Sequence, residues 1–247
     1  MASDFYGCEL TEERQGGIHI RRIEELINGI LALDERALSI ARPPDRRLAG
    51  RCHHYVRLLV AFLRAKGIPA RVRCGFGAYF NPGYFEDHVL CEHWSGAAQR
   101  WVLVDPQFDE VWRERLSIEH DHLDVPRDQF IVAAEAWEMC RSGAADPARF
   151  GIGHAQMYGL WFIAGSLIRE IAASNKVEVL PWDVWGAQPR PDESLSRDQL
   201  AFFDELAALA REPDESLDQL RERYEVDDRL RVPATVFNAL LGRPEAI

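Results

Sequence analysis

Residues 50–76, GRCHHYVRLLVAFLRAKGIPARVRCGF, contain the change from helix to strand on which the fold depends. A helix is expected from about residue 52 to 66, with Gly67 at the position of a helix C-cap. The apolar side chains of this helix recur on one face, and they are Tyr55, Leu58, Leu59, Phe62 and Leu63. The stretch therefore predicts an amphipathic helix that begins at a cysteine and leads into a strand.

Three extended segments follow this helix. Residues 69–80 alternate imperfectly between apolar and polar side chains, and residues 87–94, DHVLCEHW, alternate more clearly. Residues 100–105, RWVLVD, have the pattern of a half-buried strand, and SGAAQR between the last two segments predicts a hairpin loop. The expected fold class is α+β, with the cysteine-bearing helix packed on an antiparallel sheet.

The rest of the chain has mostly helical patterns. Residues 18–40 carry apolar side chains near helical spacing before Pro43 and Pro44 interrupt them. Further helices are expected over 126–141, 153–173, 196–211 and 214–224, and after Pro233. We expect an N-terminal helical segment over 1–45, a catalytic core over 46–125 and a helical C-terminal extension over 126–247. The loop at 186–195 is the best candidate for a boundary that separates the core from a helical appendage.

The composition narrows the class of partner. The 29 Lys and Arg residues against 40 Asp and Glu give a formal net charge of −11, which disfavours nucleic acid and anionic membranes. The acidic N-terminus lacks the apolar core of a signal peptide, and no apolar run is long enough for a membrane helix. Five irregularly spaced cysteines do not suggest a disulfide framework. We therefore expect a cytoplasmic protein.

Cys52, His88 and Asp105 occur in the local settings that thiol catalysis requires. The cysteine begins a helix, the histidine begins a strand and the aspartate ends the next one. A helix N-terminus stabilises an anion by about 0.3–1 kcal/mol, less than the ~2 kcal/mol needed to ionise an ordinary thiol well below pH 7. Cys52 therefore needs a protonated His88 if it is to be a thiolate. Taken singly, each residue also fits a structural role.

The strand-pairing register expected for this hairpin brings His88 and Asp105 together. If Trp94 faces Trp101, Asp105 lies opposite Leu90, and His88 and Asp105 become diagonal neighbours on one face. A slip of one residue would place them on opposite faces. Asp109 has the same parity but follows Pro106, and Asp87 points to the face opposite His88, so Asp105 is the preferred partner.

Three other patterns offer weaker alternatives. Cys91, His93, His120 and His122 would have to come together to form a zinc site, but their spacing matches no zinc motif, so no metal is expected. GFGAYFNPG near 75–83 has neither the lysine of a phosphate-binding loop nor a following helix, and it predicts a turn or a cleft loop. Possible walls of a substrate cleft are Tyr79, Tyr84 and Phe85. The arginines at 42, 46, 47 and 51 form a basic cluster that could attract an acidic group or pair with nearby acids.

The segments around these three residues resemble the transglutaminase-like core of bacterial cysteine-nucleophile proteins. The resemblance is carried by the cysteine helix with its GIPAR turn, by DHVLCEHW and by WVLVDPQ, and it covers about residues 46–110. Val89-Leu90 departs from the Ala-Trp that often follows the family histidine. The resemblance implies an α+β papain-like core in which Cys52 is the nucleophile, His88 the general base and acid, and Asp105 the residue that orients His88.

The resemblance also implies a class of reaction. The Cys52 thiolate would attack an amide or other acyl group of a small molecule or peptide, form a thioester, and release the acyl group to an amine or to water. No cofactor is expected, and the family includes both transferases and hydrolases. The alternative is a non-catalytic scaffold or binding protein that acts through its helical extension.

Overall fold

The computed structural model describes residues 6–8, 11–211 and 213–247. Its α-helices are α2 (Glu12–Gln15), α3 (Ile23–Leu33), α4 (Cys52–Ala65), α5 (Glu110–Leu116), α6 (Ala133–Arg141), α7 (Leu160–Ser174), α8 (Arg197–Arg211) and α9 (Pro213–Val226). Its strands are β1 (Ala70–Asn81), β2 (Tyr84–Ser95), β3 (Arg100–Val104), β4 (Phe130–Val132), β5 (Phe150–Ile152), β6 (Met157–Tyr158), β7 (Asp183–Val184), β8 (Thr235–Asn238) and β9 (Arg243–Ala246). Short 3₁₀ turns occupy η1 (Gly16–His19), η2 (Pro44–Arg46), η3 (Pro147–Arg149) and η4 (Gly153–Ala155).

The protein has an α+β fold with a mostly antiparallel, mixed sheet of six strands. Strand β2 is central: it pairs antiparallel with β1 along most of its length, antiparallel with β3 near its end, and parallel with β5 at Phe85 and Glu86. Strands β4 and β6 extend the sheet beyond β1 and β5. A second, three-stranded sheet is formed by β7, β8 and β9.

Helix α4 packs on the sheet through an apolar stripe rotated from the expected one. Val56 and Val60 are fully buried against β1 and β2, whereas Tyr55 and Phe62 are exposed by 41% and 38%. The expected stripe was therefore correct only on the side that contains Leu59 and Leu63. The helix ends as expected, because Gly67 adopts a positive φ of 73° that favours glycine.

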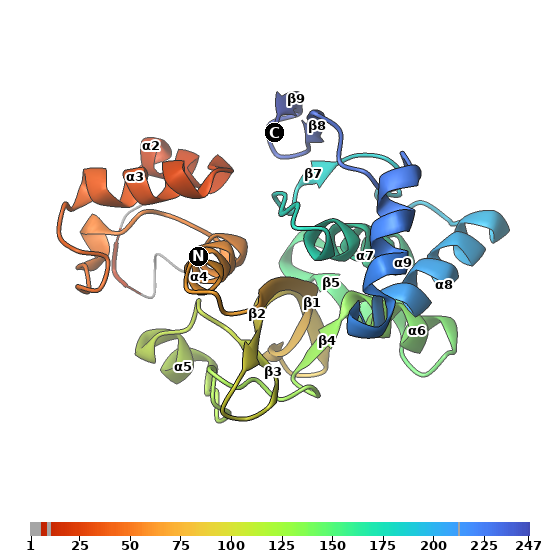
Figure 1. Cartoon of the computed structure of the whole chain (residues 1–247), viewed down its shortest axis with the longest axis horizontal. Coiled ribbons are helices and arrows are strands. Elements are labelled where there is room, and N and C mark those ends of the chain that lie inside the picture. Colours follow the sequence, from red (N-terminus) through yellow and green to blue (C-terminus); the bar gives the residue numbers. More distant parts are fainter. Residues whose placement is uncertain (1–5, 9–10, 212) are drawn as a thin grey trace.

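Helices α6, α7, α8 and α9 surround the main apolar core. Trp137, Leu167 and Phe203 are fully buried there, and Phe76 and Phe150 join them from the sheet. Figure 1 shows α8 and α9 at one end of the molecule and α2 and α3 at the other, beyond α4. Helix α7 contacts β1 and, through Ala173, reaches the apolar cluster under α4.

A buried charge network attaches α7 to β1, next to the residues of β1 that pair with β4. One carboxylate oxygen of Glu170 accepts a hydrogen bond from the backbone N–H of Cys74 at 2.5 Å, and the other pairs with Arg73 at 2.5 Å. Arg73 also pairs with Glu92 at 2.9 Å. Burial by itself lowers the pKa of Arg73, but the two carboxylates outweigh burial and raise it. Each buried charge of this network therefore has an opposite charge beside it.

The helical expectation for the C-terminal half needs three corrections. Residues 130–132 form strand β4 on β1, and helix α6 begins only at Ala133 rather than near Pro126. Residues 150–158 form β5, η4 and β6 before α7 begins at Leu160. After Pro233 the chain forms the hairpin of β8 and β9 instead of a final helix. These strands are very short, and β4, β5 and β8 each pair with a strand distant in the sequence, which local periodicity does not reveal.

The N-terminal helical pattern is also shorter than expected. The pattern over 18–40 yields η1 and α3, and α3 ends at Leu33. None of the described helices combines the length and apolar character that crossing a bilayer requires.

Candidate active site

Cys52 is the first residue of α4, at the positive end of the helix dipole. The preceding residue, Arg51, has extended backbone angles, and its N–H donates to Nδ1 of His54 at 3.0 Å. This bond closes the first turn of the helix and fixes where Cys52 enters it. The thiol is free and partly exposed. The local sequence therefore places a reachable sulfur at a helix end that favours negative charge.

His88 and Asp105 lie side by side, as the expected register of the hairpin predicts. Trp94 lies opposite Trp101 and Cys91 opposite Val104, which confirms the assumed register. His88 and Asp105 are exposed by only 3% and 0%, and His88 Nε2 lies 2.6 Å from Asp105 Oδ2. The distance is that of a strong, charge-assisted hydrogen bond.

Asp105 is held by further hydrogen bonds on both carboxylate oxygens. Oδ2 also accepts from the Tyr79 hydroxyl at 2.9 Å, and Oδ1 accepts from the Gln107 N–H at 3.1 Å. Its own backbone N–H donates to the carbonyl of His122 at 2.8 Å. The carboxylate therefore has a fixed orientation toward His88.

The two rival aspartates have other partners. Asp109 caps α5 by accepting from the N–H of Trp112 at 3.2 Å, and it also accepts from the Tyr6 hydroxyl. Asp87 lies on the other face of β2, 3.5 Å from Arg169. Among these three aspartates, only Asp105 is paired with His88.

The surroundings of His88 favour its protonated form. Burial by itself lowers the pKa of His88, but the charge and hydrogen bond of Asp105 oppose this effect, and the hydrogen bond and charge of Cys52 add to the opposition. The net result raises the pKa of His88 to about 10. A thiol beside an imidazolium held in this way is in the setting that produces thiolates.

The three aromatic residues expected to line a cleft have other surroundings. The Tyr79 hydroxyl is bound to Asp105, as described above. Phe85 is half-buried, stacks on Phe150 with ring centroids 4.4 Å apart and packs against the main core. Tyr84 is half-buried beside Glu86, and burial followed by the charge of Glu86 raises its pKa to about 12.

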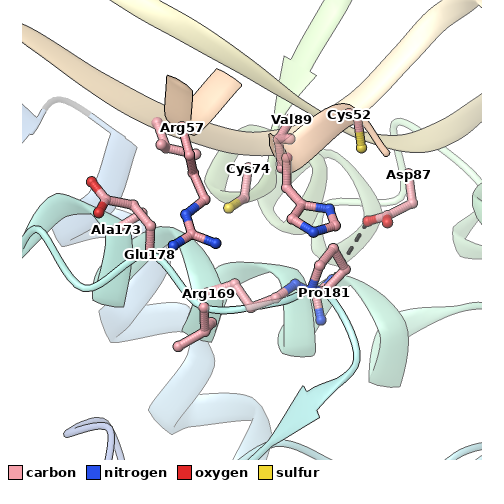
Figure 2. A pocket seen from close by; sticks show the side chains of 12 residues that line it. Cys52, Arg57, Cys74, Asp87, Val89, Arg169, Ala173, Glu178 and Pro181 are labelled. Carbon is pink, nitrogen blue, oxygen red and sulfur yellow. Dashed lines mark hydrogen bonds and ion pairs between the residues drawn. The ribbon is translucent and has the colours of Figure 1, made fainter. Parts of the chain in front are cut away.

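A small cavity on the other side of Cys52 was missed by the sequence reasoning. It has a volume of about 30 Å³ and lies among α4, β1, β2, α7 and the segment after α7. Its polar lining residues are Cys52, His53, Arg57, Asp87, Arg169 and Glu178. Figure 2 shows Cys52 and Asp87 at one end, while Arg57 points in from the other. The lining comes from segments more than 100 residues apart, so only the fold brings it together.

The weaker alternatives resolve as follows. Cys91 is buried in the apolar cluster under α4, and the ring of His120 lies 5.1 Å from that of Tyr79. Within the part of the chain that the structure describes, no three metal-binding side chains cluster. In the basic cluster, Arg42 donates to backbone carbonyls and Arg47 pairs with Asp109 at 3.4 Å. These two arginines therefore serve the fold.

Comparisons with known proteins agree with this architecture. Residues 31–106 match the family model described as the transglutaminase-like superfamily. The protein-glutamine gamma-glutamyltransferase of Pseudomonas aeruginosa is 38% identical over 76 residues, which cover 28% of this chain and only 11% of that relative. No solved structure matches the chain significantly. The segment matched by the family model contains the cysteine helix and the hairpin that carries His88 and Asp105. Over this core, the protein is therefore similar to the transglutaminase-like superfamily.

Proposed function

We propose that the protein is a cysteine-dependent acyltransferase or amide hydrolase. In this proposal Cys52 is the nucleophile, His88 is the general acid and base, and Asp105 orients His88 and stabilises its protonated form. The observation that carries the proposal is the 2.6 Å contact between buried His88 and buried Asp105, together with a Cys52 near enough to help raise the pKa of His88. A structural histidine needs neither a buried carboxylate partner nor a thiol at a helix N-terminus.

The proposed reaction has two stages. The Cys52 thiolate attacks the carbonyl carbon of an amide, and the backbone N–H of Cys52 is the proposed donor to the resulting oxyanion. As the carbon–nitrogen bond breaks, the His88 imidazolium gives its proton to the departing amine, leaving a thioester on Cys52. An incoming amine or water then loses a proton to His88 and attacks the thioester. The carbon–sulfur bond breaks, Cys52 leaves as a thiolate, and the product is a new amide or an acid.

The proposed substrate is a carboxamide of a peptide or small molecule. The curated relative is named as a protein-glutamine gamma-glutamyltransferase, and its matching segment supports a carboxamide as the acyl donor. The match covers 11% of the relative, so the choice between transfer and hydrolysis must come from experiment.

Product analysis tests the proposal and makes this choice. The protein is incubated with peptides that contain glutamine, asparagine or a C-terminal amide, with and without a primary amine, and the products are weighed by mass spectrometry. Transfer replaces ammonia by the added amine, whereas hydrolysis replaces the amide by an acid. Acid quenching should also trap the acyl group on the peptide that contains Cys52.

Two cysteine variants provide the controls. Cys52→Ala should reduce turnover by at least about 10³-fold without unfolding the protein. Cys140→Ala removes a cysteine on α6, away from the site, and should retain turnover. Turnover that survives in Cys52→Ala would refute the proposed nucleophile. If the protein is folded but Cys52 is unreactive and is acylated by none of the substrates, a binding or scaffold role is favoured instead.

A further inference from the structure

The cavity beside Cys52 contains the half-buried guanidinium of Arg57, which forms no ion pair with any residue that the structure describes. Arg57 projects from α4, one and a half turns after Cys52, and one of its nitrogens donates to the backbone carbonyl of Arg21. Among the described residues, no carboxylate lies within 4.0 Å of its guanidinium. Burial therefore lowers the pKa of Arg57, and the more distant charges of Glu178 and Asp183 do not restore it. Arg73, whose two carboxylates outweigh its complete burial, shows the opposite result.

The acidic side chains of the cavity wall already have cationic partners. Glu178 pairs with Arg64 at 2.8 Å, and Asp87 lies 3.5 Å from Arg169. Asp183, farther from the cavity, pairs with Arg21. The wall and its direct partners therefore contain three guanidiniums and two carboxylates. The cavity favours an anion over a cation, because only a new anion would pair with Arg57.

His53 adds an unsatisfied hydrogen-bonding group to the same wall. Its side chain is 2% exposed, and neither ring nitrogen has a hydrogen-bond partner among the described residues. Burial, followed by the charge on His54, lowers its pKa well below 6.5, so the imidazole is neutral and has one N–H to donate. Leaving such a donor without a partner costs about 1–3 kcal/mol. A ligand in the cavity that accepts a hydrogen bond would remove this cost.

We propose that this cavity binds a carboxylate of the acyl substrate, with Arg57 supplying the charge and His53 an N–H donor. A volume of about 30 Å³ has room for one or two water-sized groups, which matches a carboxylate. The planar fork of a guanidinium also suits carboxylate geometry. This inference rests on the proposed function, because it takes Cys52 as the reacting group. It narrows the substrate to amides that carry an acidic group close to the reacting carbonyl.

The geometry defines the spacing that the test must use. Cys52 and Arg57 lie toward opposite ends of the cavity in Figure 2, so the carboxylate should be separated from the reacting carbon by a short linker. The alkylating agents N-iodoacetylglycine and N-iodoacetylglycinamide have such a linker, and they differ only in a terminal carboxylate or carboxamide. Their rates at Cys52 can be followed by mass spectrometry of the intact protein and divided by their rates with glutathione.

The acidic agent should alkylate Cys52 at least about tenfold faster than the amide, after the glutathione correction. In Arg57→Met, this corrected preference should disappear, so that the two agents react with Cys52 in the same ratio of rates as with glutathione. Arg51→Met is the matched control, because it removes an exposed positive charge next to Cys52 that does not line the cavity. It should retain the preference. His53→Phe keeps a ring against Trp182, lacks the N–H and should reduce the preference several-fold.

The outcomes separate this inference from the proposed function. If the neutral agent reacts at Cys52 no faster than with glutathione at pH 6, the thiolate account fails. If the neutral agent reacts quickly but the acid is not preferred, the carboxylate site is refuted. Loss of the preference in Arg51→Met would also refute the site, because surface charge would then explain the preference. Should Arg57→Met fail to fold, an undiminished preference in His53→Phe would contradict the proposed donor.

Discussion

Two buried histidines near Cys52 differ in the charge that their surroundings favour. His88 and His53 are exposed by 3% and 2%, so burial disfavours the charge of both imidazoles. Asp105 lies 2.6 Å from His88 and, together with Cys52, raises the pKa of His88 to about 10. No carboxylate among the described residues opposes the burial of His53, and the pKa of His53 is lowered well below 6.5. The comparison teaches that the partner, more than the depth of burial, decides which histidine carries a proton.

This difference suits the two sides of the cysteine to different tasks. A protonated His88 can stabilise a thiolate and later protonate a leaving amine. A neutral His53 can donate a hydrogen bond without adding a second charge that competes with His88 for the sulfur. Four predictions test this comparison, and they follow in order of expected effect.

Removing the carboxylate should make His88 resemble His53. In Asp105→Asn the pKa of His88 should fall by several units, because burial is no longer opposed by a negative charge. Alkylation of Cys52 by iodoacetamide at pH 6 should then slow by about 10²-fold, since an ordinary thiol is ionised to less than about 1% there. Asp109→Asn, which changes the cap of α5, is the control and should slow the reaction little. Equal rates in the two variants would mean that Asp105 does not govern the thiolate.

His88 should make the protein less stable in alkali. Its proton is bound more tightly in the folded protein than in the unfolded chain, so its stabilisation is complete below about pH 6.5 and is lost as pH rises to about 10. The loss should be on the order of a few kcal/mol. Urea unfolding at a series of pH values measures it, and the slope should be smaller in Asp105→Asn. An identical slope in both proteins would contradict the raised pKa of His88.

His53 and His54 should act in the opposite direction, on the acid side. Burial is the main cause that lowers the pKa of His54 to about 4, and His53 shifts in the same direction. The unfolded chain therefore takes up protons first, and stability falls as pH drops from about 6.5 to 4.

The variant His54→Asn tests the acid side. Its amide oxygen can still accept from the Arg51 N–H, but the side chain no longer titrates. The loss of unfolding free energy on acidification should be smaller by up to about 3 kcal/mol. Replacing the exposed His154 with Asn is the control and should leave the acid limb as it was. An unchanged acid limb in His54→Asn would show that His54 is not held neutral.

Tyr79→Phe should have the smallest effect. The hydroxyl shares Asp105 Oδ2 with His88, so its loss leaves more of the negative charge for the imidazole and should raise the pKa of His88 by less than one unit. The upper step in the pH profile of Cys52 alkylation, at the pH where His88 loses its proton, should move up accordingly. The free energy of unfolding should fall by about 1 kcal/mol. Tyr84→Phe is the matched control, because no described residue bonds to the Tyr84 hydroxyl. A downward shift of this step in Tyr79→Phe would show that the Tyr79 hydroxyl does not compete with His88 for Asp105.

The sequence predicted the segments in which structure is local. The hairpin between β2 and β3 has a short loop, so the register at Trp94 and Trp101 could be inferred, and with it the meeting of His88 and Asp105. Helix α4 was likewise predicted from Cys52 to its glycine cap, although its buried face was not. These features depend on spacing within about 15 residues.

Distant contacts explain what the sequence could not predict. Strand β4 has three residues and exists because β1 offers an open edge, so its local pattern was mistaken for a helix start. Phe85 was expected at a cleft wall from its aromatic side chain alone, and its stacking on Phe150, 65 positions later, could not be inferred from the local sequence. The cavity near Cys52 is lined by residues of α4, α7 and the segment after α7. No sequence motif indicates whether Arg57 has an ion-pair partner.

We propose that His88 makes Cys52 a reactive nucleophile. The most direct test of this proposal is alkylation by iodoacetamide from about pH 4 to 9, in the unchanged protein and in His88→Ala, with mass spectrometry reporting the rate at each of the five cysteines. We expect Cys52 alone to react quickly well below pH 7 and to lose this advantage in His88→Ala. A Cys52 that reacts like an ordinary thiol in both proteins would contradict the proposal.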